Sequence, residues 1–219
     1  MITTSGRVYE QRGQVYVLTS RPAVDNLSDE VTVQWHDSRL RSNEQIRKAF
    51  ALMAEIGAHV GESDKEVYEE QRMLFSAKFI DDLNGMMFHL SNATVSEASA
   101  FINFLVELII ENGIETHEPL YKMCEDIRRY VYASLVNKKC AVCGRKAELH
   151  HVQAIGMGYS RLEKPQIGCF VLPLCREHHQ EWHSIGGTAF DNKYHLEPVT
   201  LDQRLAKVYG LTKKARGVA

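Results

Sequence analysis

The sequence predicts an α+β fold, with antiparallel strands and helices in the N-terminal region and a small domain rich in cysteine and histidine towards the C-terminus. Three observations lead to this prediction. Short alternating runs near the start of the chain indicate strands, and helix signals, including three apolar stripes with helical spacing, follow them. The last third of the chain then gathers four of the five cysteines and six of the ten histidines.

The first expected elements are strands. Residues 7 to 18 (RVYEQRGQVYVL) carry β-branched and aromatic residues on both sides of Arg12-Gly13. Two such runs joined by a short glycine-containing turn are typical of a β-hairpin. A further run at 31 to 35 (VTVQW) alternates apolar and polar residues, as a strand with one buried face does. We therefore expect an N-terminal antiparallel sheet.

Four helices are expected next, because residues that favour a helix start occur at four positions. These starts are Ser42-Asn43, Ser63 with Glu66, Thr94 with Glu97, and Pro119 as the first residue of the fourth helix. The first helix should end at Gly61, the second at about Phe79 and the third at Gly113. The fourth should run without a break into the cysteine region.

The apolar stripes of these helices are expected to form the core. Their members are Ile46, Phe50, Met53, Ile56 and Val60 in the first helix, Ala98, Phe101, Leu105 and Leu108 in the third, and Leu120, Met123, Ile127, Val131 and Leu135 in the fourth. Cys124 lies on the apolar side of the fourth helix, so we expect it to be a buried core thiol.

The charge of the chain changes sign after Asn137. Residues 1–137 contain 13 Lys+Arg and 21 Asp+Glu, whereas residues 138–219 contain 13 and 7, giving net charges of -8 and +6. A basic C-terminal third is typical of a module that binds a polyanion. We therefore predict two domains, an α+β domain over 1–137 for targeting, DNA binding or dimerisation, and a second, basic domain over 138–219.

The chain has neither an apolar run of roughly 20 residues, which crossing a bilayer requires, nor a signal pattern at its N-terminus. A cytoplasmic protein without membrane contact is therefore expected. In such a compartment, clustered cysteines favour metal ligation over disulfides.

One group of four residues has the spacing of a structural zinc site. Cys140 and Cys143 are separated by two residues and followed by Gly144, which lets backbone amides approach the sulfurs. Cys175 and His178 have the same two-residue gap. Together they predict a tetrahedral Cys₃His zinc site.

A second group consists of histidines. His179 and His183 are four residues apart, so on a helix they lie on one face and can share a second metal. His150 can reach the same metal from a strand. Neighbouring strand residues point to opposite faces, so His150 and His151 need either a twist of the strand or different roles. One as ligand and the other as base is a sensible division.

The order of these motifs over about residues 138 to 196 resembles the HNH endonucleases, specifically zinc-stapled HNH proteins of bacteriophages. The motifs are Cys140-Ala-Val-Cys143, Glu148-Leu-His150-His151 and Leu174-Cys175-Arg-Glu-His178-His179-Gln-Glu-Trp-His183. The resemblance implies a ββα-metal fold that hydrolyses DNA phosphodiester bonds. It implies that His150, His179 and His183 hold a catalytic divalent cation (Mg²⁺, Mn²⁺ or similar) and that His151 activates water.

A looser resemblance covers the whole chain and extends to phage recombination proteins of the Orf type with an appended HNH domain. It implies a role in DNA recombination or repair, a homodimer, and single-stranded or branched DNA as substrate. Single-strand-binding or other recombination proteins are the protein partners that it suggests.

Further residues near the motifs have expected roles. Glu148 is expected either to orient one of the histidines or to pair with Arg145. Arg145, Arg161 and Arg176 are candidates for contacts with DNA phosphates. The segment Gly156-Met-Gly158-Tyr-Ser-Arg161 matches a loop of phage relatives. Phe170 occupies the position of the usual HNH asparagine. That asparagine organises its own loop by hydrogen bonding, so its replacement puts the rigidity of this loop in question.

Two other classes of function compete with an endonuclease. The first is a non-catalytic DNA-binding recombination mediator that keeps the HNH fold as a zinc scaffold, and the second is a zinc-stabilised protein-interaction module. The presence of His151 beside three presumed ligands favours the endonuclease, because a scaffold has no need of that histidine.

Overall fold

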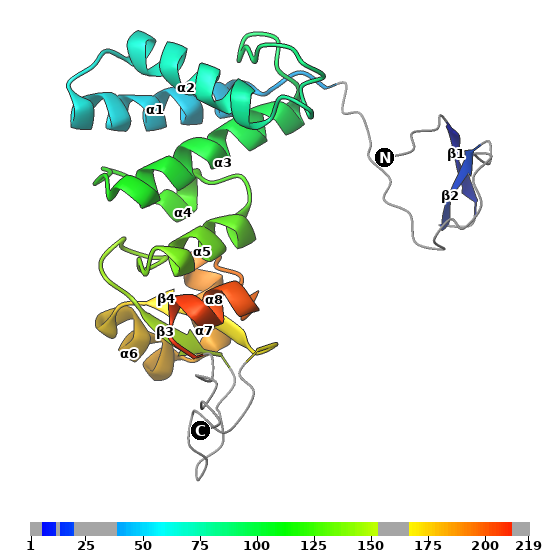
Figure 1. Cartoon of the computed structure of the whole chain (residues 1–219). Coiled ribbons are helices and arrows are strands. Elements are labelled where there is room, and N and C mark those ends of the chain that lie inside the picture. Colours follow the sequence, from blue (N-terminus) through cyan, green and yellow to red (C-terminus); the bar gives the residue numbers. More distant parts are fainter. Residues whose placement is uncertain (1–5, 12–13, 20–38, 153–166, 212–219) are drawn as a thin grey trace, which may run out of the picture. The chain divides into compact units, whose positions relative to one another are not determined.

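A computed structural model describes residues 6–11, 14–19, 39–152 and 167–211 (Figure 1). The chain divides into two compact units, Met1–His36 and Asp37–Ala219. In the first unit, strands β1 (Gly6–Gln11) and β2 (Gln14–Thr19) pair antiparallel, from Gly6 opposite Thr19 to Gln11 opposite Gln14. The predicted hairpin is thus confirmed, whereas the strand expected at 31–35 lies outside the described residues.

Three long helices begin the second unit where the sequence predicts them. They are α1 (Asn43–Val60), α2 (Asp64–Lys78) and α3 (Val95–Asn112). Each starts with a capping box, in which the side chains of the N-cap residue and of the residue three positions later hydrogen-bond each other's backbone N–H groups. Gly61 and Gly113 end α1 and α3 in the left-handed conformation, with φ of 81° and 65°.

The core face of α1 differs from the predicted stripe. Ala49, Leu52 and Ile56 are buried, but Phe50 is 44% exposed and Val60 is 54% exposed. Each helical residue is rotated by about 100° from the one before it, so Phe50 lies well round from the face that contains Ala49. Val60 is the last residue of α1. The stripe of α3 agrees better, with Ala98, Phe101 and Leu105 buried and Leu108 half-buried.

The predicted fourth helix is wrong, because it is broken into α4 (Leu120–Met123) and α5 (Ile127–Val136), with Pro119 just before the first helical residue. The Asn103 Oδ1 atom of α3 accepts hydrogen bonds from the backbone N–H groups of Glu125 (3.1 Å) and Asp126 (3.2 Å). The Asp126 carboxylate then caps α5 by accepting from the Arg129 N–H at 3.0 Å. These bonds satisfy the backbone N–H groups that the break between α4 and α5 exposes. The apolar spacing alone does not reveal this break.

Cys124 lies at this break and is half-buried, not fully buried as expected. Its Sγ is 3.4 Å from the Tyr121 carbonyl oxygen, to which the thiol donates. Burial raises the pKa of the thiol to about 11. Cys124 is therefore a neutral thiol that packs against the core.

The hydrogen bonds at the break predict a large effect for one substitution. Asn103→Ala is expected to destabilise the fold by about 1–3 kcal/mol, because it leaves two backbone N–H groups without an acceptor. Asn112→Ala is the matched control on the same helix, since Asn112 is exposed and bonds only the Leu108 carbonyl. Chemical denaturation measures both free energies of unfolding, and equal values for the two variants would contradict the assignment.

The remainder of the second unit contains a small antiparallel sheet of order β3-β4-β5 with helices around it. The strands are β3 (Glu148–His151), β4 (Phe170–Leu174) and β5 (Val199–Thr200), and the helices are α6 (Arg176–Ile185), α7 (Gly187–Tyr194) and α8 (Gln203–Val208). The α+β class is confirmed. The order β3, β4, α6 has the strand–strand–helix form that a ββα-metal fold requires.

Helix α5 connects the long helices to this sheet. The Tyr130 hydroxyl donates to the Ala141 carbonyl (2.8 Å), and the Tyr209 hydroxyl donates to the Leu135 carbonyl (3.1 Å). Buried apolar residues form one core from α1 to α8. The separate roles of residues 1–137 and 138–219 stay a prediction. None of the helices in the described ranges has the length and apolar character to cross a membrane.

Candidate metal centre

The first ligand group is assembled by a tight turn and a helix start. The Gly144 N–H donates to the Cys140 carbonyl (2.8 Å), and the Cys140 N–H donates to the Arg145 carbonyl (2.7 Å). Gly144 has a φ of 68°, which glycine adopts without steric cost. Cys175 is the N-cap of α6, and His178 follows in its first turn. The turn and the helix start thus present their side chains to each other.

The distances in this group fit a tetrahedral zinc ion. Its ligand atoms all lie within 4.8 Å of one another. The Cys143 and Cys175 sulfurs are 3.7 Å apart, and His178 Nδ1 lies 3.5 Å from the Cys140 sulfur and 3.1 Å from that of Cys175. Zinc bonds of about 2.3 Å to sulfur and 2.0 Å to nitrogen separate tetrahedral ligand atoms by about 3.5–3.8 Å. The residues present can therefore hold zinc.

Burial explains why a cation is needed at this position. Cys140 is fully buried, and this burial raises the pKa of its thiol to about 12. A thiol of this kind ionises at neutral pH when a bound cation compensates the thiolate charge. The zinc ligation predicted from the cysteine spacing thus agrees with the chemistry of the site.

Arg145 contacts the sulfurs of this group. Its Nε donates to the Cys143 Sγ at 3.3 Å and its Nη2 to the Cys175 Sγ at 3.8 Å, while Nη1 donates to the Glu177 carboxylate at 3.0 Å. Burial is the largest single effect on Cys143 and opposes its ionisation, but the hydrogen bonds from Arg145, Cys140 and Cys175 together lower the pKa of this thiol. Glu177, and not the expected Glu148, is the acidic partner of Arg145.

These contacts predict that Arg145 stabilises the zinc thiolates. Arg145→Ala should weaken zinc binding about tenfold or more, as is typical when a residue that hydrogen-bonds a metal ligand is lost. Transfer of zinc to a chromogenic chelator measures the effect. Arg176→Ala is the matched control, because Arg176 is an exposed cation at the start of α6. Zinc transfer at the same rate from both variants would contradict a role for Arg145.

The second ligand group consists of His150 from β3 and His179 and His183 from α6, whose ligand atoms lie within 4.8 Å of one another. The Nε2 atoms of His179 and His183 are 3.1 Å apart. The His150 ring centroid is 4.6 Å from that of His179 and 5.4 Å from that of His183. The structure thus brings together the three side chains that the sequence assigns to a second metal.

The state of His150 suits a metal ligand. It is 2% exposed, and its Nε2 atom has no hydrogen-bond partner among the described residues. Burial, followed by the nearby His179 and His183 rings, lowers the pKa of His150 to about 4. Its imidazole is therefore neutral at pH 7, which is the form that binds a cation. His183 is exposed, so the group is open to solvent on one side.

The other predicted site residues lie around this group. His151 is half-buried and follows His150 in β3, where neighbouring side chains point to opposite faces. Glu148 is exposed at the start of β3, and Arg176 is exposed at the start of α6. Phe170, the first residue of β4, is 47% exposed. Arg161 and the segment from Gly156 to Arg161 lie outside the described residues.

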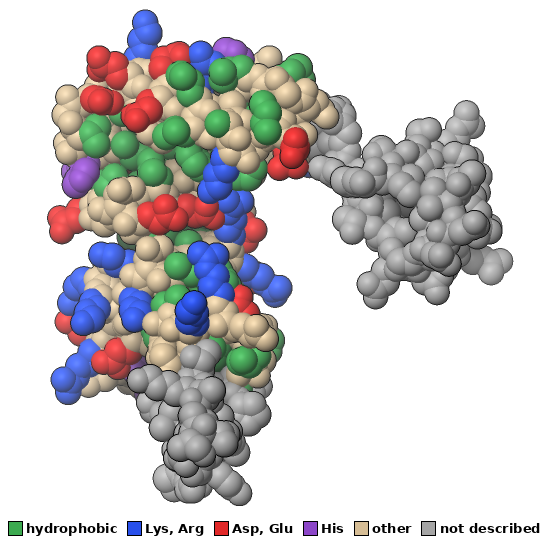
Figure 2. All heavy atoms as spheres, in the orientation of Figure 1, with side chains coloured by type: hydrophobic (Ala, Val, Ile, Leu, Met, Phe, Trp, Pro, Cys, Tyr) green, Lys and Arg blue, Asp and Glu red, His purple; other side chains and the backbone are tan. Residues whose placement is uncertain are grey.

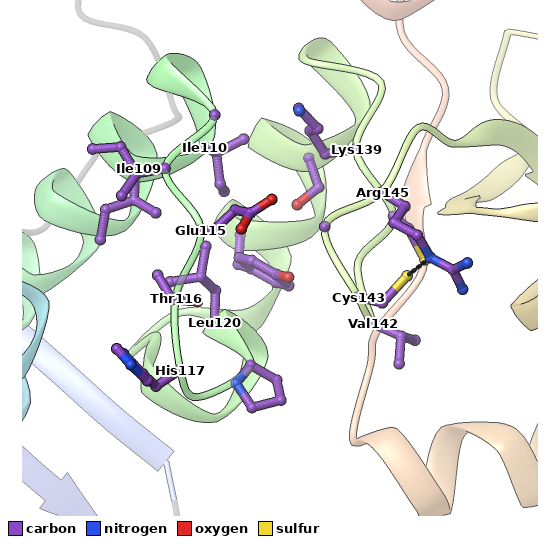
Figure 3. A pocket seen from close by; sticks show the side chains of 17 residues that line it. Ile109, Ile110, Glu115, Thr116, His117, Leu120, Lys139, Val142, Cys143 and Arg145 are labelled. Carbon is purple, nitrogen blue, oxygen red and sulfur yellow. Dashed lines mark hydrogen bonds between the residues drawn. The ribbon is translucent and has the colours of Figure 1, made fainter. Parts of the chain in front are cut away.

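A groove of about 510 Å³ adjoins the zinc-ligand group (Figure 3). Apolar side chains at the end of α3, such as Ile109 and Ile110, form one wall, and the turn that holds Cys143 and Arg145 forms another. No histidine of the second group lines the groove. The groove and the second group are therefore different sites.

Comparison with known proteins gives a family and a short local match. The family model described as "Putative HNHc nuclease" matches residues 18–212. A stretch of 56 residues is 45% identical to the "Uncharacterized protein YdfU" of Escherichia coli (strain K12), covering 25% of this chain and 15% of that protein. The chain thus spans about a seventh of the length of this relative. No solved structure matches the chain.

Proposed function

Because the chain belongs to this HNH nuclease family, we propose that it is a metal-dependent endonuclease that hydrolyses DNA phosphodiester bonds. The observation that carries the proposal is the group of His150, His179 and His183 on β3 and α6, beside a separate Cys₃His group. A zinc scaffold requires only the Cys₃His group. Three further imidazoles whose nitrogens converge are what binding of a catalytic divalent cation requires.

In this proposal each group has one task. Cys140, Cys143, Cys175 and His178 hold the structural zinc that fixes the start of α6 against the turn before β3. His150, His179 and His183 hold the catalytic cation. When bound, such a cation offsets the charge that develops on the attacked phosphate and on the leaving 3′ oxygen.

His151 is the proposed general base. A neutral imidazole can accept a proton from a water molecule as the water attacks phosphorus, and no nucleophilic side chain is then needed. The position of His151 directly after the buried His150 in β3 supports this assignment. Glu148, at the exposed start of β3, is proposed to orient a histidine.

The charge of the surface supports a polyanionic substrate. Lys and Arg side chains gather on the visible face of the part built from α5 to α8, whereas carboxylates and hydrophobic side chains predominate over α1 and α2 (Figure 2). Arg161 and Arg176 are the proposed phosphate contacts. Arg145 is a weaker candidate, because its guanidinium already pairs with Glu177 and the sulfurs.

The biological setting is a proposal that rests on the looser resemblance to phage Orf-type proteins. We propose action in phage DNA recombination or repair in the host cytoplasm, on single-stranded or branched DNA. A homodimer and contact with single-strand-binding or other recombination proteins belong to the same proposal.

A cleavage assay tests the proposed activity. Zinc-loaded protein is incubated with supercoiled plasmid, single-stranded DNA and branched DNA, in Mg²⁺, Mn²⁺, Ni²⁺ or Zn²⁺. Cleavage that requires the divalent ion is expected from the wild-type chain and not from His183→Ala. Equal cleavage by the two proteins would overturn the proposal.

One observation favours the second candidate, a DNA-binding mediator without cleavage. Phe170 stands where the family asparagine usually organises the site, and its side chain is 47% exposed. A mediator would shift DNA in a salt-dependent manner. It would leave every substrate uncut with all four ions, so the cleavage assay separates the two candidates.

A further inference from the structure

Helix α6 presents a third aromatic side chain to the second ligand group. His179, Trp182 and His183 are spaced three and four residues apart, so they lie on one face of the helix. The same face directs His179 and His183 towards His150 on β3. Trp182 thus occupies a position between the helix and the buried strand ligand, and the sequence prediction assigned it no role.

The indole of Trp182 packs against the ligand rings. Its centroid is 4.2 Å from that of His150 at an interplanar angle of 58°, and 5.1 Å from that of His183 at 87°. Its distance to the His150 ring is shorter than that of His179 or His183. Among the described residues, Trp182 is therefore the aromatic side chain whose ring centroid lies closest to that of His150.

Packing contributes to the orientation of this ligand. Metal-binding histidines are held in direction by contacts of the ring atoms that do not bind the metal. The Nε2 atom of His150 has no hydrogen-bond partner among the described residues, and the rings of Trp182, His179 and His183 surround the imidazole. These packed rings therefore restrict the directions that the imidazole can take.

Helix α7 holds the indole from another side. A Cβ atom at Gly187, the first residue of α7, would lie only 2.9 Å from Trp182 Cζ2 and 3.3 Å from Cε2. Real side chains do not tolerate the shorter of these distances, so glycine allows α7 to start directly against the ring. The position of Trp182 is thus determined by both α6 and α7.

We propose that Trp182, packed between the His150 ring and the glycine start of α7, is a positioning residue that holds His150 in the direction required to bind the catalytic cation. The inference rests on the proposed function, because it assumes that His150, His179 and His183 bind a metal. Trp182 touches neither substrate nor water in this role. It acts only through His150.

The test measures binding of Ni²⁺ to the zinc-loaded full chain by isothermal titration calorimetry. Trp182→Leu removes the aromatic ring, Trp182→Phe retains a smaller one, and Gly187→Ala pushes against the indole. We expect Ni²⁺ affinity to fall about tenfold to a hundredfold in Trp182→Leu. The Ni²⁺ affinity should fall less in Trp182→Phe than in Trp182→Leu. In Gly187→Ala it should fall by at least as much as in Trp182→Phe. Ile185→Ala, an exposed position on the same helix, is the matched control with unchanged affinity.

Zinc content and cleavage separate positioning from a merely structural role. In the positioning role, Trp182→Leu retains its structural zinc, and saturating divalent ion restores most of its cleavage rate. If Trp182→Leu loses zinc, Gly187→Ala decides, because it displaces the indole while retaining Trp182 and every ligand side chain. Wild-type Ni²⁺ affinity in a zinc-loaded Trp182→Leu or Gly187→Ala protein overturns the inference.

Intrinsic fluorescence gives an independent readout of the same geometry. The chain contains two tryptophans, so Trp35→Phe leaves Trp182 as the sole one. One equivalent of Ni²⁺ beyond the zinc should quench this fluorescence, and His183→Ala should abolish the quenching at that concentration. If the wild-type chain binds no second ion at all, the proposed function fails. If it binds a second ion that does not change the Trp182 fluorescence, and whose affinity does not depend on Trp182, only this inference fails.

Discussion

Cys140→Ser is expected to release the structural zinc and to unfold the part of the chain around β3, β4 and α6. Structural zinc contributes about 10–16 kcal/mol of apparent binding free energy near neutral pH, which exceeds the stability of most domains. Cys140 is fully buried, and its sulfur faces His178 Nδ1 at 3.5 Å. A serine hydroxyl at this position is a poor zinc ligand and a buried polar group without its cation.

Elemental analysis and circular dichroism measure this effect. Wild-type protein prepared without chelator should contain about one tightly bound zinc per chain, and the Cys140→Ser protein none. Cys169→Ser is the matched control, because Cys169 is a half-buried thiol that belongs to neither ligand group. Wild-type protein that contains no zinc and yet retains its full helical circular dichroism signal would show that the four residues are not a metal site.

The long helices could be predicted from the sequence because their ends depend on local interactions. Capping boxes and left-handed glycines act within a few residues, so Ser63 with Glu66 or Gly113 can be recognised in the chain itself. The break between α4 and α5 could not, since it depends on Asn103, more than twenty residues away. An apolar stripe continues across such a break when its spacing happens to match.

The same reasoning applies to the candidate site. Ligand spacing in a turn or on a helix is local, so both groups of candidate metal ligands were predicted, and the structure brings the members of each together. Arg145 and Trp182 were not assigned their observed contacts, because these depend on how the turn, β3 and the start of α7 pack on α6. A Trp at the third position after His179 is the one sequence signal that indicated a shared face.

His151→Ala is the second substitution for which we expect a large effect. Loss of a general base lowers the cleavage rate by about a hundredfold or more. Zinc content and DNA affinity should stay close to those of the wild type, because His151 is not assigned to either ligand group. His59→Ala provides a matched control, since His59 is exposed at the end of α1.

Comparison with His183→Ala distinguishes a base from a ligand. His183→Ala should also lose cleavage, but through weaker binding of the divalent ion, so raising the ion concentration should partly restore its rate. The same addition cannot restore His151→Ala, because a cation does not replace a missing proton acceptor. Wild-type rates from His151→Ala at equal ion concentration would place the base elsewhere, whereas rescue by metal would make His151 a ligand.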